Sequence, residues 1–251
     1  PLRNELVQRG GELAWHPPYM QSRYSDWVAG LKGDWLISRQ RYFGVPIPLW
    51  YRLDANGNPS FDDVLVPNED ELPIDPSTDV PAGFSEAQRG LPDGFIGEAD
   101  VMDTWATSSL TPQIAGDWEG DGDLFRRVFP MDLRPQGHDI IRTWLFATMV
   151  RSHHEFAGAP WSNASISGFI LDPDRKKLAK SKGNATTTPL HLLEEHGTDA
   201  VRYWAANGRL GVDTIFDEGQ MNVGRKLATK LLNASKFVLS FGKPPDGATA
   251  T

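Results

Sequence analysis

Apolar residues recur every three or four positions in several segments of the chain, which is the spacing of one face of a helix. Residues 2–13 predict a helix that stops at Gly10-Gly11, and residues 19–31 predict a second helix that ends at Gly33. In the second half of the chain, the same spacing predicts helices over residues 139–156, 189–196, 198–207 and about 217–241.

Short apolar runs predict strands over residues 47–53, 132–136 and 164–171. Asn56-Gly57 follows the first run and is typical of a tight hairpin turn. Residues 54–58 also resemble the acidic start of a calcium loop, but Pro59 stands where such a loop needs glycine. We therefore predict a turn there, and an irregular surface excursion over the proline-, glycine- and acid-rich residues 67–97.

The order of these elements indicates the fold class. A strand at 132–136, a helix at 139–156 and a strand at 164–171 form a β-α-β unit, with Gly137 at the end of the first strand. Such units build parallel sheets, so the sequence predicts an α/β fold with an appended helical segment. Residues 244–251 are a linker by composition.

Composition narrows the class of protein. The 251 residues are 39% hydrophobic and 23% charged, which is typical of a globular chain, and no apolar run approaches the about 20 residues of a membrane span. The chain has no cysteine, which excludes disulfides and cysteine-bound zinc and favours a reducing, cytoplasmic setting. The net charge of −8 argues against a chain coated with nucleic acid.

Basic residues cluster after the last predicted strand. The cluster lies within one short stretch and consists of Arg175, Lys176, Lys177, Lys180 and Lys182. Ligands of α/β folds bind at the carboxyl ends of parallel strands, where lysine ammonium groups can neutralise phosphate oxygens. A solvated charged loop is the alternative interpretation, and composition alone does not decide between the two.

The order of residues within this stretch carries a resemblance to a known family. Residues 177–181 read Lys-Leu-Ala-Lys-Ser and are similar to the lysine signature of the class I aminoacyl-tRNA synthetases, Lys-Met-Ser-Lys-Ser. Residues 182–184 match the usual continuation of that signature. Ala179 departs from the usual serine but leaves both lysines in place, so we expect an altered loop that still works.

Three earlier segments extend the resemblance over nearly the whole chain. Residues 35–40 look like the segment that follows the editing insertion in the valine, isoleucine and leucine enzymes. Residues 100–105 and 137–144 resemble the valine-specific members in particular. Arg39 and Gln40, within the first segment, are interpreted as structural hydrogen-bonding residues.

The resemblance implies the second half of a Rossmann-like parallel sheet, followed by the start of a helical stem and anticodon-binding region. It divides the chain into a helical connector after the editing insertion (1–32), the C-terminal half of the nucleotide-binding catalytic domain (33–173), the lysine loop with stem helices and the first tRNA-binding helix (174–243), and a tail (244–251).

The resemblance also implies a reaction. ATP, accompanied by Mg²⁺, activates valine as valyl-adenylate, and the valyl group then passes to tRNA(Val). Lys177 and Lys180 are the catalytic residues in this scheme, because they contact the leaving phosphates. The resemblance places ATP and the adenylate against Gly137, Asp139, Ser167, Gly168, Phe169, Ile170 and Lys180. It places the valine side chain between Trp105, Ile140 and Trp144.

Several of these assignments have a structural alternative. Asp139 is also the kind of acid expected near a helix N-terminus, and Gly137 can be a simple turn glycine. Ile140 and Trp144 lie four positions apart and can form the core stripe of one helix. His138 has no evident role in this chemistry and is interpreted as structural, and no protein-bound metal is predicted.

The His-x-Gly-His signature of the family does not occur in the chain. We therefore expect the chain to begin just after the editing insertion, to end as the tRNA-binding helices begin, and to be inactive without the N-terminal half of the catalytic domain as its partner. Two alternatives stay open. One is a fragment of an isoleucine- or leucine-specific synthetase, and the other is a truncated synthetase-like protein that serves as a binding module.

Overall fold

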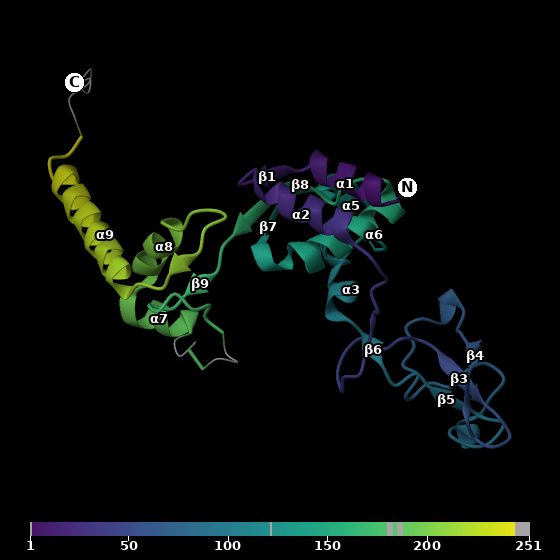
Figure 1. Cartoon of the computed structure of the whole chain (residues 1–251). Helices are drawn as coiled ribbons and strands as arrows, with labels where there is room; N and C mark the ends of the chain where they lie inside the picture. Colours follow the sequence, from purple (N-terminus) through teal and green to yellow (C-terminus); the bar gives the residue numbers. More distant parts are fainter. Residues whose placement is uncertain (1, 121, 180–182, 185–187, 244–251) are drawn as a thin grey trace. The chain divides into compact units, whose positions relative to one another are not determined.

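The structure, a computed structural model, describes residues 2–120, 122–179, 183–184 and 188–243, so the predicted tail lies outside the described part. The chain forms two compact units whose segments alternate along the sequence. Figure 1 labels the helices and strands of the chain. The first unit combines Pro1–Leu13, Gln21–Asp132 and Ile140–Ser162. The second unit combines Ala14–Met20, Leu133–Asp139 and Asn163–Thr251.

The chain begins with two helices, α1 (Leu2–Glu12) and α2 (Met20–Gly30). α2 is confirmed, but the prediction that α1 stops at Gly10-Gly11 is wrong, because the helix continues through both glycines. Gly10 is buried, and a Cβ atom there would lie 2.3 Å from the ring of Tyr24 in α2. The Tyr24 hydroxyl donates a hydrogen bond to the Leu6 carbonyl at 2.9 Å. Gly10 therefore allows the close packing of the two helices and does not end the first one.

A small antiparallel sheet follows in the order β4-β3-β5, from β3 (Trp50–Leu53), β4 (Pro59–Leu65) and β5 (Phe95–Gly97). The predicted turn joins β3 to β4 and is confirmed. Gly57 has a φ of +82°, and Oδ1 of Asp54 accepts hydrogen bonds from the backbone N–H groups of Asn56 and Asn58. β5 was not predicted, because its three residues lie within a stretch dominated by prolines, glycines and acids.

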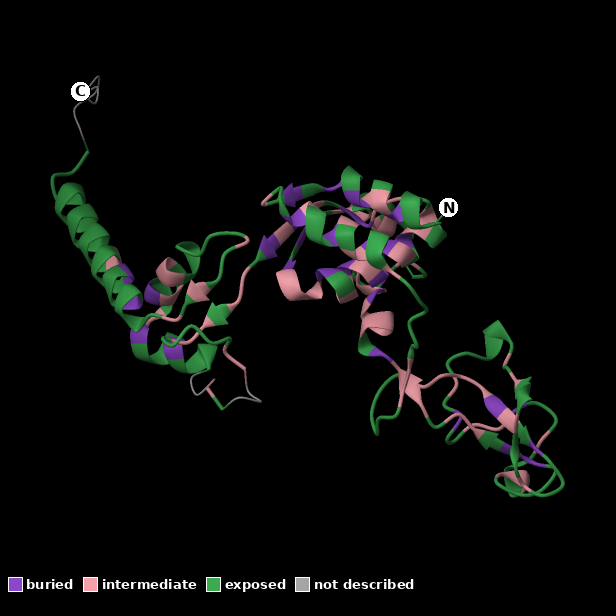
Figure 2. Cartoon of the chain, viewed as in Figure 1, coloured by how far each residue is buried: buried purple, intermediate pink, exposed green. Residues whose placement is uncertain are grey.

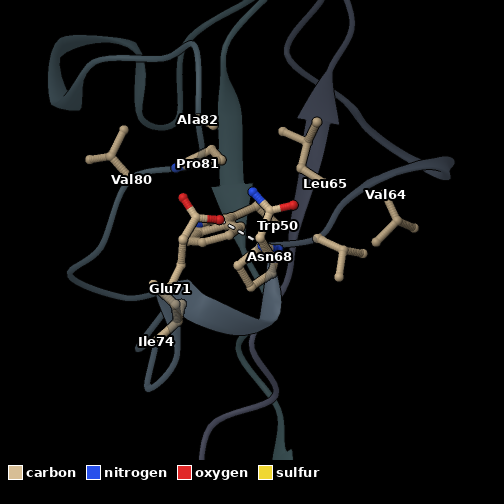
Figure 3. A pocket seen from close by; sticks show the side chains of 11 residues that line it. Trp50, Val64, Leu65, Asn68, Glu71, Ile74, Val80, Pro81 and Ala82 are labelled. Carbon is tan, nitrogen blue, oxygen red and sulfur yellow. Dashed lines mark hydrogen bonds between the residues drawn. The ribbon is translucent and has the colours of Figure 1, made fainter.

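The excursion over residues 67–97 covers one tryptophan of this sheet. Trp50 is 1% exposed, and its indole N–H donates a hydrogen bond to the Asp79 carbonyl at 3.1 Å. The excursion contains two short 3₁₀ helices, η1 (Glu69–Glu71) and η2 (Glu86–Gln88). Beside Trp50 lies a cavity of about 300 Å³, whose lining includes Leu65, Ile74, Val80 and Pro81 (Figure 3).

A two-stranded ladder and three short helices complete this part of the chain. β2 (Ser38–Arg39) pairs antiparallel with β6 (Val101–Met102). The helices after it are α3 (Thr104–Ser108), α4 (Thr111–Ala115) and α5 (Gly122–Val128).

The helix predicted over residues 139–156 is regular only in its second part. A 3₁₀ turn, η3 (His138–Ile140), and a π-helix, η4 (Ile141–Leu145), precede α6 (Phe146–Phe156). The segment Ile-Ile-Arg-Thr-Trp is rich in β-branched and aromatic residues, which lose side-chain freedom in an α-helix. The prediction of one regular helix from residue 139 was therefore wrong over its first turns.

A three-stranded sheet has the order β1-β8-β7, from β1 (Ala14–His16), β8 (Trp161–Ser167) and β7 (Met131–Gly137). β1 runs parallel to β8, with Ala14 opposite Asn163. The predicted strand over 164–171 is broken, because β8 ends at Ser167 and a separate strand, β9 (Ile170–Leu171), pairs in parallel with β10 (Thr214–Ile215). The strand pairs β1–β8 and β9–β10 are parallel and occur together with helices, which confirms the α/β class.

Three helices end the described chain, and all three are confirmed. They are α7 (Pro189–His196), α8 (Thr198–Ala206) and α9 (Glu218–Leu239). Their common core is Leu192, Ala200 and Met221, one residue from each helix. Most of α9 is exposed (Figure 2). Among the described residues, no helix is both long enough and apolar enough to cross a bilayer.

Candidate functional site

Two of the predicted nucleotide-binding residues and one predicted catalytic lysine meet in the second unit. Asp139 follows the end of β7, Phe169 follows β8, and Lys177 follows β9. The Nζ atom of Lys177 lies 2.9 Å from Oδ2 of Asp139 and 3.8 Å from the centre of the Phe169 ring. A cation over an aromatic face is attracted by the ring, so Asp139 and Phe169 together hold the lysine side chain at this place.

The lysine also acts on the acidity of its partner. Partial burial raises the pKa of the Asp139 carboxyl, but hydrogen bonds and nearby positive charge, with those of Lys177 the largest, outweigh that effect. The net result is a pKa below the ordinary value for aspartate. Asp139 is therefore a carboxylate at neutral pH, able to accept hydrogen bonds from a ligand hydroxyl.

His138 lies beside the same group of residues. Its ring centre is 4.3 Å from that of Phe169, and its Nε2 is 3.6 Å from Oδ1 of Asp213. The Asp213 carboxylate also accepts a hydrogen bond from the Phe169 backbone N–H at 2.7 Å. These contacts fit the structural role predicted for His138, because they hold the Phe169 segment against the start of β10.

Gly137 and Ser167 lie at the ends of β7 and β8. A Cβ atom on Gly137 would lie 2.8 Å from Oδ1 of Asp139, so the glycine leaves room for that carboxylate. The Ser167 hydroxyl donates a hydrogen bond to the Gln136 carbonyl at 3.2 Å. Ile170, the first residue of β9, is exposed. Their roles in nucleotide binding stay predictions.

Gly168 lies between the end of β8 and the start of β9. A Cβ atom there would lie 2.3 Å from both the carbonyl carbon and oxygen of Val212, and 2.5 Å from the backbone nitrogen of Asp213. Backbone atoms cannot move aside as a flexible side chain can. The glycine is therefore required by the close approach of two chain segments, which also explains why one continuous strand does not form here.

We expect Gly168→Ala to destabilise the protein by about 1–3 kcal/mol, the usual cost of overpacking a tight site. The measurement is urea unfolding followed by tryptophan fluorescence. Gly33→Ala is the matched control, because a Cβ atom on Gly33 meets no heavy atom within 4 Å. Equal midpoints for Gly168→Ala and Gly33→Ala would contradict the packing argument.

The lysine loop is anchored by Asn184, a residue for which no role was predicted. The Asn184 side chain accepts a hydrogen bond from the Ala179 backbone N–H at 3.0 Å. Its Nδ2 donates to Oδ2 of Asp172 at 2.9 Å and to the Lys177 carbonyl at 3.2 Å. The only sequence signal was its place in the family's Lys-Gly-Asn continuation. Lys180, the other predicted catalytic lysine, lies outside the described residues.

The predicted amino-acid pocket residues all lie in the first unit and are partly buried. The indole N–H of Trp144 donates a hydrogen bond to the Ser108 carbonyl of α3 at 2.9 Å. Trp105 is also in α3, which packs against the π-helix that contains Trp144. Ile140 ends a 3₁₀ turn, so the argument that Ile140 and Trp144 share one face of an α-helix was wrong. Their role as pocket walls stays a prediction.

Asp103 holds the start of α3 and thereby the backbone of Trp105. Its Oδ1 accepts a hydrogen bond from the Trp105 backbone N–H at 2.8 Å, as helix N-caps do. Its Oδ2 lies 2.9 Å from Nε of Arg39, and the Asp103 side chain is only 7% exposed. Gln40 donates a hydrogen bond to Asp100 at 2.6 Å. Arg39 and Gln40 thus make the structural hydrogen bonds expected of them.

Arg39→Ala is expected to destabilise the first unit by about 1–3 kcal/mol, because it leaves a buried carboxylate without its charged partner. Arg126→Ala removes an ion pair to Asp123 in which both side chains are at least 70% exposed. That control is expected to cost less than about 0.5 kcal/mol. Urea unfolding of both variants measures the difference, and a smaller loss for Arg39→Ala than for Arg126→Ala would refute it.

The family of this chain is shown by a match over most of its sequence. The sequence model of tRNA synthetases class I (I, L, M and V) matches residues 1–217. The chain belongs to this family. The match covers the first unit and the second unit as far as residue 217, including α3 and the lysine loop.

Curated relatives of this class I synthetase chain are valine–tRNA ligases. That of Thermobifida fusca is 66% identical over 239 residues, which are 95% of this chain and 27% of the relative. That of Salinispora arenicola is 63% identical over 243 residues, or 97% of this chain and 28% of the relative. The chain thus spans just over a quarter of the length of these relatives.

Solved structures show the same class I synthetase fold. The agnB2 LeuRS of Agrobacterium radiobacter K84, in a ternary complex with tRNA and LeuAMS, has a TM-score of 0.63 at 22% identity and covers 83% of this chain and 29% of its own. The methionyl-tRNA synthetase of Mycobacterium tuberculosis, in complex with methionyl-adenylate, has a TM-score of 0.63 at 23% identity. The match covers 99% of this chain and 42% of the synthetase chain.

Proposed function

We propose that this chain is the lysine-signature half of the catalytic domain of a valine–tRNA ligase. In this proposal the complete enzyme activates valine with ATP in the cytoplasm and transfers the valyl group to tRNA(Val). The observation that carries the proposal is the convergence of Asp139, Phe169 and Lys177 at the ends of β7, β8 and β9. The identity to valine–tRNA ligases supports valine as the substrate.

The proposed reaction joins a carboxylate to a phosphate. An oxygen of the valine carboxylate attacks the α-phosphorus of ATP, the bond to the bridging oxygen breaks, and pyrophosphate leaves with its electron pair. ATP enters as its magnesium complex, so Mg²⁺ arrives with the substrate. Lys177 and Lys180 then neutralise charge that builds on the leaving phosphates, as fixed cations do in phosphoryl chemistry.

Asp139 and Lys177 have complementary tasks in this scheme. Without nucleotide the two side chains form an ion pair at 2.9 Å. A ribose hydroxyl can replace the lysine as the donor to Asp139, and a phosphate can replace the carboxylate as the partner of Lys177. Nucleotide binding thus exchanges one ion pair for two charge-assisted contacts. Lys177 is 44% exposed at its side chain, which leaves it free to make this exchange.

The substrate is tested by amino-acid-dependent ATP–pyrophosphate exchange. A suitable full-length enzyme is the Thermobifida fusca ligase in which this chain replaces the matching 239-residue segment. We expect exchange with valine to exceed exchange with isoleucine and leucine. Preference for isoleucine or leucine would make the chain part of a sister synthetase. No exchange from a folded enzyme would favour a binding module.

A further inference from the structure

Three side chains that can bind a metal ion meet where α7 ends and α9 begins. Glu195 and His196 are the last two residues of α7, and Glu218 is the first residue of α9. One ligand atom from each lies within 4.8 Å of the other two. The Nε2 atom of His196 is 3.7 Å from Oε2 of Glu218. All three residues belong to the second unit.

The imidazole of His196 distinguishes this cluster from an ordinary group of surface carboxylates. The residue is 7% exposed, and its Nε2 atom is buried without a hydrogen-bond partner among the described residues. Leaving a buried polar atom unpaired costs free energy, so such an atom calls for a partner. The Glu218 carboxylate at the start of α9 comes within 3.7 Å of this nitrogen, so the buried atom faces an oxygen of the cluster.

The spacing of the three ligand atoms fits a small divalent ion. Zinc binds imidazole nitrogen and carboxylate oxygen at about 2.0–2.2 Å, which puts tetrahedral ligand atoms about 3.4 Å apart. The distance between His196 and Glu218 is already close to this value. Both glutamates are about half exposed, so their carboxylates can move the remaining distance. Glu195 also contacts the exposed His191 at 3.3 Å, and an ion would compete for it.

The ligand types select among metals. A buried imidazole nitrogen suits zinc and its neighbours in the transition series, whereas magnesium and calcium prefer sites made only of oxygen. A cavity of about 440 Å³, lined in part by Glu195, His196 and Thr198, lies beside the cluster. It gives an ion and its remaining water a path to the site.

We propose that Glu195, His196 and Glu218 bind a divalent transition-metal ion of the Zn²⁺ type, which joins the end of α7 to the start of α9. The proposal is independent of the proposed catalytic function, because the ion would have a structural task. It would cross-link two helices whose shared core includes Leu192 and Met221. No metal was predicted from the sequence, since the third ligand lies in a different helix from the adjacent pair and follows no known ligand spacing.

The test titrates the full 251-residue chain with Zn²⁺ by calorimetry after treatment with a chelator. The chain has no cysteine, so thiolate sites do not compete. We expect one equivalent to bind and the melting temperature to rise with Zn²⁺ concentration. Glu218→Gln is expected to weaken binding at least tenfold. Glu194→Gln, which removes the neighbouring exposed charge of α7, is expected to leave the affinity within twofold. Mg²⁺ at equal concentration is expected not to bind.

A second measurement does not depend on any variant. The ¹⁵N resonance of His196 Nε2 is expected to shift when one equivalent of Zn²⁺ is added. An unshifted resonance, no binding of Zn²⁺, or affinities that Glu195→Gln and Glu218→Gln leave unchanged would overturn the proposal. His196 and Glu218 would then form an ordinary ion pair. An equal loss in Glu194→Gln would also overturn it, since a general effect of acidic charge would explain the binding.

Discussion

Lys180→Ala in the full-length enzyme is expected to lower the rate of valine-dependent ATP–pyrophosphate exchange by about 10²–10³, the usual effect of removing one electrostatic contact to a transition state. In the proposed function this lysine contacts the phosphates, whose charge grows as pyrophosphate leaves, and not the apolar amino-acid pocket. The dissociation constant for valine is therefore expected to change less than twofold. Exchange kinetics and calorimetry of valine binding measure the two quantities.

Lys176→Ala is the matched control, because it removes an exposed lysine from the same stretch. The backbone of Lys176 makes two hydrogen bonds with Asp172: its N–H donates to Oδ1 at 2.8 Å, and its carbonyl accepts from the Asp172 N–H at 2.8 Å. Both remain in the variant. We expect its exchange rate to stay within a few-fold of the parent enzyme. Equal losses in both variants would mean that the lysines act through net charge. Weaker valine binding with an unchanged rate would show that Lys180 has another role.

Features decided by short stretches of sequence were predictable. α9 begins at Glu218 because the Asp217 side chain accepts hydrogen bonds from the N–H groups of Gly219 and Gln220, and its apolar spacing is regular. The hairpin turn at Asn56-Gly57 is equally local. In both cases the residues that determine the structure lie within a few positions of each other, so the local sequence is enough to predict the element.

Features decided by distant residues were not predictable. β1 is only three residues long and exists because it pairs with β8, far along the chain. Gly10 lies inside α1, where the ring of Tyr24 occupies the space that a side chain would need. Gly168 lies where the strand ends, because the backbone of Val212 occupies the corresponding space there. From the neighbouring sequence alone, each glycine predicts the end of a helix or strand. Each is in fact required by a contact with a residue far away in the sequence.

The candidate site divides in the same way. The place of Asp139 after the carboxyl end of β7 follows from a general rule, since ligands of α/β folds bind there. Lys177 follows β9, which pairs with β10 in a separate two-stranded sheet, so its meeting with Asp139 needs more than that rule. The three hydrogen bonds of Asn184 follow from no such rule. They depend on the path by which the loop returns to Asp172. The sequence therefore predicts which segments form the site better than it predicts what holds them.

Trp144→Leu is expected to lower the preference of the full-length enzyme for valine over isoleucine by tenfold or more. Isoleucine is longer than valine by one methylene, and a pocket of fixed size gains about 1–3 kcal/mol of discrimination from such a group. Trp144 is fixed by its hydrogen bond to the Ser108 carbonyl at 2.9 Å, so its ring cannot easily turn aside. In the proposed pocket, removing the indole gives the longer side chain room.

Amino-acid-dependent exchange with valine, isoleucine and threonine measures this change without any contribution from tRNA. Threonine matches valine in shape, so its rate relative to valine is expected to stay within a few-fold. Trp118→Leu is the control: Trp118 is a partly buried indole of the same unit that packs on Phe156 at a ring distance of 5.5 Å. It is expected to lower stability and leave the ratio of valine to isoleucine unchanged. If Trp144→Leu also changed only stability, Trp144 would be a core residue and the valine pocket would lie elsewhere.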